Sequence, residues 1–506
     1  MKYIIVVFYL LINHVCFSQI KHDYYWIWNN DRERDSTQAY IFDFNDKVKK
    51  APEPLGELSP IVMVGLNASI CDKEGNLLMY SNGCTIADRN HQVMLNGRHL
   101  NNGDYFEMLG DSCFRGYLGK QDIMILPDPG YEDGYYVLHK PVLNGESPRH
   151  RELRYSNVDM NLNNGNGAVT DKNVVISDSL ELMYRYLTAI NHTNNKDWWI
   201  LQPIDKLSNE YLTIYLSEDG FSEKFIQNVG PVFDKFASAS GISVFSPDGT
   251  KYALFNPYDN LLLYDFDRST GLLSNLKQLK IKETEEVILS YIEFSPNSQF
   301  LYIDTRDSLW QVDTHEENLA DGLELLDVWD GTFDPFATSF SVMALAPNCK
   351  IYMASGSSTN TYHVINEPNE KGAACDFVQR GIQLPFTSSL GNMPNFPRFR
   401  VDEADKCDPT ITSVFGDDIY YRRDLSVYPN PVKDVLTVEI PEGRKGQLVV
   451  LDMQGQLVSS HSDFDSYTDK VQIDLSGLAV GTYSIEFLPE GNKERLVYTS
   501  QVVRVK

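Results

Sequence analysis

Two short stretches space their oxygen-bearing side chains as a calcium-binding loop would. Asp159, Asn161 and Asn163 alternate along one stretch, but Asn164 stands where such a loop needs glycine. Asp265-Phe266-Asp267 alternates in the same way and is equally incomplete. The chain also lacks a Gly-x-Ser-x-Gly elbow, a His-Glu-x-x-His helix and a Gly-x-x-x-x-Gly-Lys phosphate loop. We therefore expect no cofactor, with calcium as the alternative.

Acid–base chemistry would need histidines and carboxylates that the fold brings to one place. His139 and His363 adjoin aromatic strands, where we expect a hydrogen-bonded structural role. Three further side chains adjoin strands or turns, and no spacing selects them: His192, Asp197 and Asp304. A carboxylate pair for glycoside cleavage needs a separation that only a structure gives. The sequence therefore predicts no catalytic residue.

A turn followed by a short aromatic strand recurs along the chain and must position these side chains. The three clearest copies of this repeat are FSPDGTKYALF, FSPNSQFLYID and LAPNCKIYMAS. Their prolines, Pro247, Pro296 and Pro347, are spaced by 49 and 51 residues. Three earlier stretches have the same form: 68–80, 123–138 and 188–201. A period of about 50 residues built from turns and short strands is typical of a β-propeller with WD-like repeats.

Six such repeats are visible, and a seventh blade could combine strands from both ends of the propeller. An aromatic strand at 24–28 opens the domain, and Phe396 to Val401 ends it. Pairing these two strands would remove the open sheet edges that invite aggregation. We predict an all-β fold in which residues 20–402 form the propeller, with seven blades favoured and six as the alternative.

The first 18 residues have the pattern of a signal peptide. Lys2 supplies a positive charge, Ile4 to Ile12 is apolar, and Cys16-Phe17-Ser18 offers small residues before Gln19. The alternative is a first β-strand. No later apolar run approaches the length of about 20 residues that a membrane span needs. We therefore expect signal peptide 1–18 and an exported protein without a membrane span.

Export predicts that the remaining cysteines form disulfides, because an even number enters an oxidising compartment. These cysteines are Cys71, Cys84, Cys113, Cys349, Cys375 and Cys407. Cys71 and Cys84 flank a predicted hairpin and could face each other, and Cys84 with Cys113 is an equal alternative. The sequence does not choose among the pairings. No Cys-x-x-Cys pair suggests a zinc ribbon or a redox site.

The charge balance excludes some partners. The chain has 506 residues, of which 44 are basic and 70 acidic, giving a formal charge of −26 and a pI near 4.7. Nucleic acids and anionic membranes attract clustered Lys and Arg, so we expect neither as a partner. The ordinary interpretation of this acidity is solubility, and the alternative is an acidic surface that binds divalent cations.

The composition and the spacing of predicted strands change after residue 402. Residues 403–425 are polar and predict a linker, and 426–506 contain short strands spaced as in a small Ig-like β-sandwich. This region resembles the type A C-terminal sorting domain of the Bacteroidetes type IX secretion system. The matching residues include Tyr428, Pro429, Asn430, Pro431, Gly455, Leu475, Leu478, Gly481 and Tyr483. The resemblance implies handling by the type IX machinery and its sortase, and a cell-surface or secreted location.

The propeller also resembles secreted Bacteroidetes propellers that carry such sorting domains. Residues 75–97 and 366–396 carry the matching motifs, and the resemblance spans most of 22–401. That family has no assigned activity. The leading hypothesis is a non-catalytic module that binds a protein or a glycan. The alternative is a propeller hydrolase that acts on a carbohydrate or lactone at the central channel.

Overall fold

The protein is described by a computed structural model that covers residues 20–505. Its description leaves out the following segments: 31–37, 46–52, 55–58, 64, 104–115, 118, 142–151, 206, 234–240, 282–289, 385–386, 389–392, 402–406, 410, 412–420, 441–444, 453–456, 462–468 and 490–495. The predicted signal peptide therefore lies outside the described residues. The chain divides into two compact units, 1–414 and 415–506, and the division falls inside the predicted linker.

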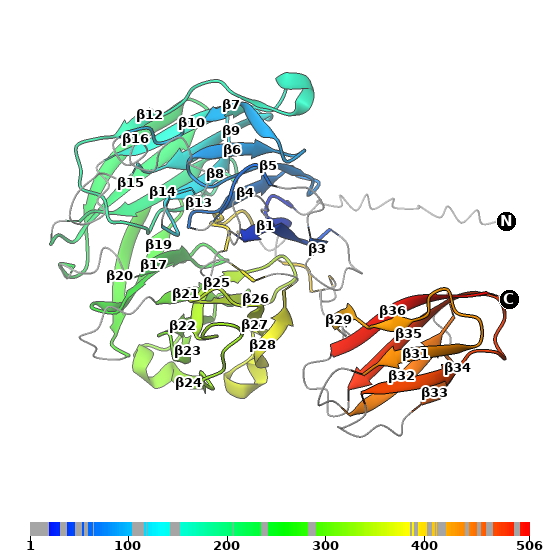
Figure 1. Cartoon of the computed structure of the whole chain (residues 1–506). Coiled ribbons are helices and arrows are strands. Elements are labelled where there is room, and N and C mark those ends of the chain that lie inside the picture. The colour runs from blue at the N-terminus through cyan, green and yellow to red at the C-terminus, as the bar shows by residue number, and fades with distance from the viewer. Residues whose placement is uncertain are drawn as a thin grey trace, which may run out of the picture. The chain divides into compact units, whose positions relative to one another are not determined.

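The first unit is a succession of small antiparallel sheets that follow one another around a ring (Figure 1). Blade 1 has β1 (Tyr25–Asn30), β2 (Gln38–Asp43) and β3 (Glu53–Pro54). Blade 2 has β4 (Ala68–Cys71), β5 (Leu77–Ser81), β6 (Thr85–Asp88) and β7 (Val93–Arg98). Blade 3 has β8 (Ile123–Pro127), β9 (Gly134–His139), β10 (Leu153–Asp159) and β12 (Val174–Ser177). The short β11 (Ala168–Val169) pairs with both β7 and β10 and joins blades 2 and 3.

The other four blades each contain four consecutive strands. Blade 4 has β13 (Thr188–Asn191), β14 (Trp198–Pro203), β15 (Glu210–Ser217) and β16 (Gly220–Asn228). Blade 5 has β17 (Ile242–Phe245), β18 (Lys251–Asn256), β19 (Asn260–Asp267) and β20 (Leu272–Leu279). Blade 6 has β21 (Tyr291–Phe294), β22 (Phe300–Asp304), β23 (Ser308–Asp313) and β24 (Leu323–Val328). Blade 7 has β25 (Phe340–Leu345), β26 (Ile351–Ser355), β27 (Thr361–Ile365) and β28 (Phe377–Gln383).

Aromatic side chains close the ring between blades 1 and 7. The rings of Trp28 and Tyr362 lie 6.0 Å apart, and those of Trp26 and Tyr352 are equally close at 6.0 Å. The hydroxyl groups of Tyr40 and Tyr362 are 3.4 Å apart in the same interface. Buried aromatic pairs of this kind stabilise a contact beyond their buried area. The described strands thus form a seven-bladed propeller, which confirms the predicted fold class.

The recurring turn owes its shape to one side chain in each copy. Asp248 Oδ1 accepts hydrogen bonds from the backbone N–H of Thr250 (3.0 Å) and from Ser246 Oγ (2.6 Å). Asn297 makes the equivalent bonds in the next copy, to Gln299 N (3.1 Å) and Ser295 Oγ (2.6 Å). The following residue then takes a positive φ: Gly249, Ser298 or Cys349. Asp and Asn favour such turns because they bond their own backbone two residues on.

The second unit is a small sandwich of two sheets. One sheet has β29 (Tyr421–Asp424), β36 (Leu496–Arg504), β35 (Gly481–Pro489), β32 (Gly446–Leu451) and β33 (Leu457–His461). The other has β30 (Val427–Tyr428), β31 (Val435–Glu439) and β34 (Lys470–Asp474). Apolar side chains from both sheets fill one core, among them Leu436, Leu448, Ile473 and Ile485. The strand β29 falls inside the segment predicted as linker.

Candidate functional site

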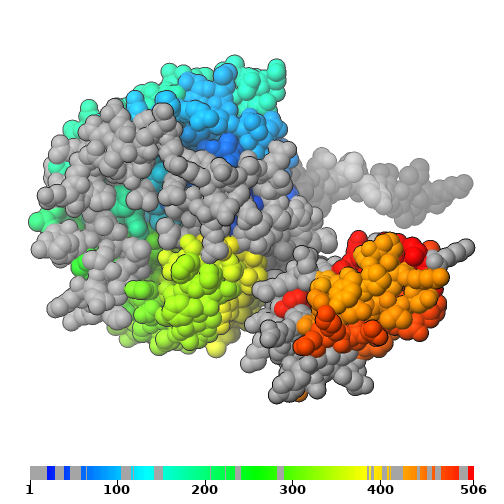
Figure 2. Space-filling view, viewed as in Figure 1, coloured from blue at the N-terminus to red at the C-terminus, as the bar shows by residue number. Residues whose placement is uncertain are grey.

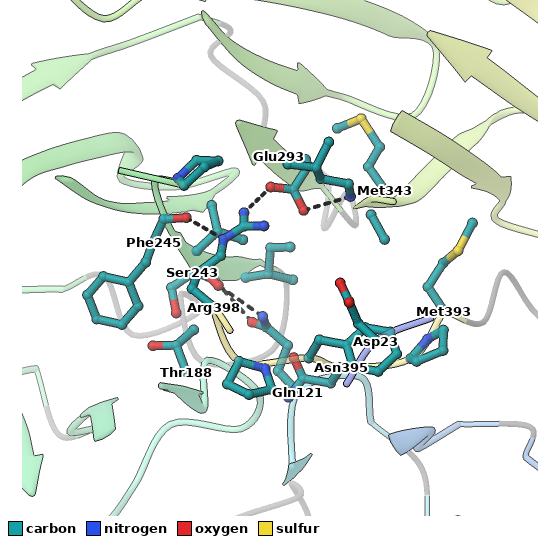
Figure 3. A pocket seen from close by; sticks show the side chains of 18 of the residues that line it. Asp23, Gln121, Thr188, Ser243, Phe245, Glu293, Met343, Met393, Asn395 and Arg398 are labelled. Atoms are coloured by element: carbon teal, nitrogen blue, oxygen red, sulfur yellow. Dashed lines mark hydrogen bonds and ion pairs between the residues drawn. The ribbon is translucent and has the colours of Figure 1, made fainter. Parts of the chain in front are cut away.

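A cavity of about 100 Å³ lies between the inner strands of the propeller. Its wall is formed by residues of β13, β17, β21 and β25 and by the segment 393–400 (Figure 3). Gln121, which precedes β8, reaches across to β17: its Nε2 donates to Ser243 O (2.9 Å) and its Oε1 accepts from Ser243 N (3.1 Å). The inner strands of separate blades therefore meet at this cavity.

Residues 393–401, here called the channel segment, run along the inner strands. The Asn395 N–H donates to Asn67 O (2.8 Å) just before β4, and its Nδ2 donates to Ile123 O (2.9 Å) at the start of β8. Three residues later the Arg398 N–H donates to Ala189 O (3.0 Å), and Arg398 forms a parallel bridge with Ile190. The channel segment therefore lies inside the ring and parallel to β13.

Two arginines of the channel segment neutralise the acids of the cavity wall. Arg398 pairs with Glu293 of blade 6, and its Nε donates to Phe245 O of blade 5 (2.7 Å; Figure 3). Glu293 Oε2 also accepts from the Leu345 N–H of blade 7 (3.1 Å). Arg400 pairs with Asp23, and both acids are only 5% exposed. A buried carboxylate needs such a partner because losing its hydration is costly.

The prediction that 396–401 completes the seventh blade as a strand is wrong. Pro397 has no backbone N–H to donate, and the stretch forms only an isolated bridge at Arg398 instead of a continuous ladder. Its aromatic side chains pack in the ring instead: Phe396 lies 6.0 Å from Trp26, and Phe399 lies 5.9 Å from Trp198, measured between ring centroids. Blade 1 is built from β1, β2 and β3 without it.

The cysteines pair only in part as predicted. Cys349 and Cys407 form a disulfide that holds the chain beyond the channel segment to the last recurring turn, where Asp408 N also donates to Pro347 O (2.7 Å). Cys71 and Cys375 are buried free thiols, so their predicted pairing, including Cys71 with Cys84, is wrong. Burial raises the pKa of both thiols. Cys84 is disulfide-bonded. The predicted alternative that pairs it with Cys113 falls on a residue outside the described part of the chain.

The two histidines that adjoin strands have structural partners. His139 lies with Nδ1 2.6 Å from Asn101 Oδ1 and Nε2 2.9 Å from Ser156 Oγ. His363 Nδ1 accepts from the Arg380 N–H (3.2 Å). Burial lowers the pKa of each histidine to about 3, so both are neutral near pH 7. Neither lines the cavity.

The other acid–base candidates are also apart from the cavity wall. Asp197 Oδ2 accepts from Tyr215 Oη (2.5 Å) and Asn194 Nδ2 (2.7 Å), and His192 Nδ1 accepts from Asn194 N (3.2 Å). Asp304 accepts from Tyr291 N (2.9 Å), and burial raises the pKa of its carboxyl group well above the usual value. The structure therefore does not bring His192, Asp197 and Asp304 together in the cavity.

The two calcium candidates cap turns. Asp159 Oδ1 accepts from the Asn161 N–H (2.9 Å) and from Tyr131 Oη (3.2 Å). Asp267 Oδ1 accepts from the Ser269 N–H (2.8 Å). Within the described segments, no group of three or more His, Cys, Asp or Glu side chains is placed to hold a metal ion. Calcium binding at these loops stays a prediction.

Lys120 is a cavity residue that sequence reasoning missed. It is half-buried in the wall, and burial together with the nearby Arg185 lowers its pKa to about 7. Glu293 and Arg398 were missed as well, because they lie 105 residues apart in the chain. The sequence did contain a signal, because Arg398 and Arg400 alternate with apolar residues in FPRFRV, and charged groups in an apolar run need a partner when they are buried.

The sorting motif organises the second unit. Asn430 Nδ2 donates to Gln501 O (2.8 Å) and its Oδ1 accepts from Val503 N (3.0 Å), which ties the motif to β36. Leu475 is fully buried, Leu478 packs against the same core, and Tyr483 Oη donates to Ala479 O (2.8 Å). Gly455 lies outside the described residues. The described motif residues therefore stabilise the β-sandwich through hydrogen bonds and core packing.

Comparison with known proteins identifies this unit. Residues 426–499 match the family described as secretion system C-terminal sorting domain. The chain therefore carries a type IX sorting domain, which marks it for export to the cell surface or for secretion. No helix in the described part of the chain is long and apolar enough to cross a membrane. No curated protein matches the chain.

Several solved structures are similar to it in fold. A "putative 6-phosphogluconolactonase" from Bacteroides fragilis is 11% identical, with a TM-score of 0.39, over 73% of this chain and 97% of that chain. PorZ, a surface component of the type IX secretion system of Porphyromonas gingivalis, is 10% identical, with a TM-score of 0.30, over 93% and 68%. AztD from Citrobacter koseri is 12% identical, with a TM-score of 0.31, over 89% and 98%.

Proposed function

We propose that this exported propeller is a non-catalytic module that binds a protein or a glycan after delivery by the type IX secretion system. The observation that carries the proposal is the channel segment, which occupies the space between the inner strands with the chain's own residues. The remaining cavity of about 100 Å³ is smaller than the roughly 300–1,000 Å³ of small-molecule sites. Ligands would then bind on the loops that surround the channel.

The charges of the cavity support the same proposal. A general acid or base must have a proton to exchange with substrate, and its carboxylate must be within reach of that substrate. Glu293 and Asp23 are instead buried and bound to Arg398 and Arg400. Their geometry is that of structural ion pairs, which fix the channel segment to blades 1 and 6.

The test uses the purified mature protein, from Gln19 onward. It is applied to a glycan array and to a panel of surface and extracellular proteins, and in parallel to a broad hydrolase screen, each with and without calcium. The proposal expects saturable binding to at least one ligand and no turnover. Product formation by the protein, absent from a heat-inactivated sample, would overturn the non-catalytic assignment.

One observation favours a second candidate, a hydrolase acting on a carbohydrate or lactone. Lys120 lines the cavity with a pKa of about 7, and a lysine with such a pKa is partly neutral and nucleophilic at physiological pH. If the screen detects hydrolysis, Lys120→Met should abolish it, whereas Lys73→Met on an exposed turn should not. Hydrolysis that survives Lys120→Met would exclude this lysine as the catalytic group.

A further inference from the structure

Residues 329–338, in the loop between β24 and β25, present aromatic side chains to solvent. Phe333 is 67% exposed and Phe336 is 52% exposed, although phenylalanine is normally buried. Trp329 is half-buried at the base of the loop, with its ring centroid 5.8 Å from that of Phe333. The loop connects blades 6 and 7, whose residues are coloured green to yellow in Figure 2. We call residues 329–338 the aromatic loop.

The aromatic loop is held by hydrogen bonds at its base and its tip. Trp329 Nε1 donates to Thr338 Oγ1 (3.1 Å), and Thr338 Oγ1 donates to Thr332 O (3.0 Å), which closes the base. At the tip, Asp334 N donates to Phe336 O (2.8 Å). Asn360 of blade 7 then donates to Asp334 through its backbone N–H and through Nδ2, each at 3.0 Å. A platform fixed in this way loses little conformational entropy when a ligand binds.

Carboxylate and amide groups are fixed in the aromatic loop and on the adjacent strands. Asp330 forms a two-pronged ion pair with Arg380 of β28 (3.0 and 2.6 Å) and keeps 42% of its side chain exposed. Gln379, also on β28, donates from Nε2 to Asp327 (2.9 Å). The Arg380 hydrogen bond lowers the pKa of Asp330 to about 2, so this pair stays ionised from pH 4 to pH 8. Hydrogen-bonding groups are thus fixed within a few residues of both phenylalanines.

We propose that the aromatic loop is the binding site for a neutral glycan, an inference that rests on the proposed binding function. A sugar ring has an apolar face that stacks on an aromatic side chain and a rim of hydroxyl groups that bond carboxylates and amides. The aromatic loop offers both kinds of contact through Phe333, Phe336 and Asp330.

The charge of the site selects between classes of ligand. Asp330 and Asp334 belong to the aromatic loop, Asp327 lies just before it in β24, and Arg380 is already paired. The whole chain has a formal charge of −26. An anionic glycan would be repelled by this field. The central part of a protein–protein interface is usually depleted of charged residues, whereas this loop carries Asp330 and Asp334 together with the exposed rings. A neutral sugar fits both features.

The experiment titrates the mature protein with three neutral probes, cellohexaose, xylohexaose and mannohexaose, and with the anionic hexagalacturonate. Calorimetry gives the affinity, and the fluorescence of Trp329, assigned with Trp329→Phe, gives the location. We expect at least one neutral probe to bind with an unchanged affinity from pH 4 to pH 8. Phe333→Ala and Phe336→Ala should each weaken binding about tenfold, the loss typical of an interface anchor.

Leu272→Ala is the matched control, because Leu272 is an exposed apolar residue (47%) on blade 5, and it should not change the affinity. The inference is overturned if no neutral probe binds, if hexagalacturonate binds more tightly, or if both phenylalanine variants bind normally. It is also overturned if Phe333→Ala abolishes capture of a protein ligand instead. If the inference fails in any of these ways, saturable binding of a ligand at another part of the protein would still support the proposed binding function. Hydrolysis of a probe would contradict the proposed function itself.

Discussion

Arg398 and Glu293 form a buried ion pair inside the ring of blades. Replacing Arg398 by methionine would leave Glu293 without its cation at a site where the carboxylate is 5% exposed. Removing one partner of a buried pair costs about 3–5 kcal/mol. We therefore expect Arg398→Met to lower the unfolding free energy of the propeller by roughly this amount in guanidinium denaturation.

Two matched variants separate this effect from a general loss of charge. Lys73→Met breaks the exposed Lys73–Glu132 pair and should leave the stability unchanged. Adding Glu293→Gln to Arg398→Met should restore part of the loss, because the stranded carboxylate is then neutral. An Arg398→Met protein as stable as Lys73→Met would contradict the assigned role of the pair.

His139 and His363 predict how the stability of the propeller changes with pH. Each is fully buried, with a folded-state pKa of about 3 against 6.5 for an ordinary histidine. Between these values the unfolded chain binds a proton that the folded chain does not, so stability is lost as the pH falls below 6.5. Each histidine contributes a loss of about 1.4 kcal/mol per pH unit in this range.

The measurement is denaturant unfolding at pH 7, 6, 5 and 4 for the wild type and for His139→Gln. The variant should lose stability less steeply than the wild type below pH 6.5, because one titrating group has been removed. The difference between the two curves isolates the histidine from the carboxylates. Parallel curves would show that His139 takes up a proton in the folded protein.

The channel segment depends on the disulfide that follows it. Cys349–Cys407 closes a loop of 58 residues that contains the segment, and such a crosslink stabilises a protein by about 2–4 kcal/mol. We expect Cys407→Ser to increase amide hydrogen exchange in residues 393–401 while the outer strands of blades 4 and 5 remain protected. Cys375→Ser, which removes a buried free thiol, is the control. Unchanged exchange at 393–401 in Cys407→Ser would contradict this dependence.

The blades could be predicted from sequence because their signals are local. The turn at Asp248 and its copy at Asn297 are formed by side chains that bond their own backbone, so short-range chemistry specifies both. The channel segment could not be predicted in the same way. Its partners, Asn67, Ile123 and Glu293, come from three blades and meet only when the ring has closed.

The pairing of the cysteines also could not be predicted from local sequence. Cys71 and Cys84 flank one hairpin, which favours their pairing on local grounds, yet Cys71 is a buried free thiol. Cys349 and Cys407 are 58 residues apart and pair because the chain leaves the channel beside the last turn. For the aromatic loop, sequence reveals the residues Phe333 and Phe336 but not their exposure, which depends on bonds from blade 7.

For the whole molecule, the sorting domain determines where the propeller acts. Removing residues 415–506, the complete second unit, leaves the first unit with its own core and disulfide. We expect this truncated protein to be absent from the cell surface and the medium and to accumulate in the periplasm, as immunoblots of cell fractions would show. Normal surface display or secretion of the truncated protein would contradict the role of the sorting domain.

One calorimetric titration distinguishes a binding module from an enzyme. The ligand found on the glycan or protein arrays is injected into the mature protein, and the heat flow is followed after each injection. A binding module gives heat that saturates and returns to baseline, with the ligand recovered intact, and this is the predicted result. A steady heat flow that lasts until the ligand is consumed would demonstrate turnover and contradict a non-catalytic binding function.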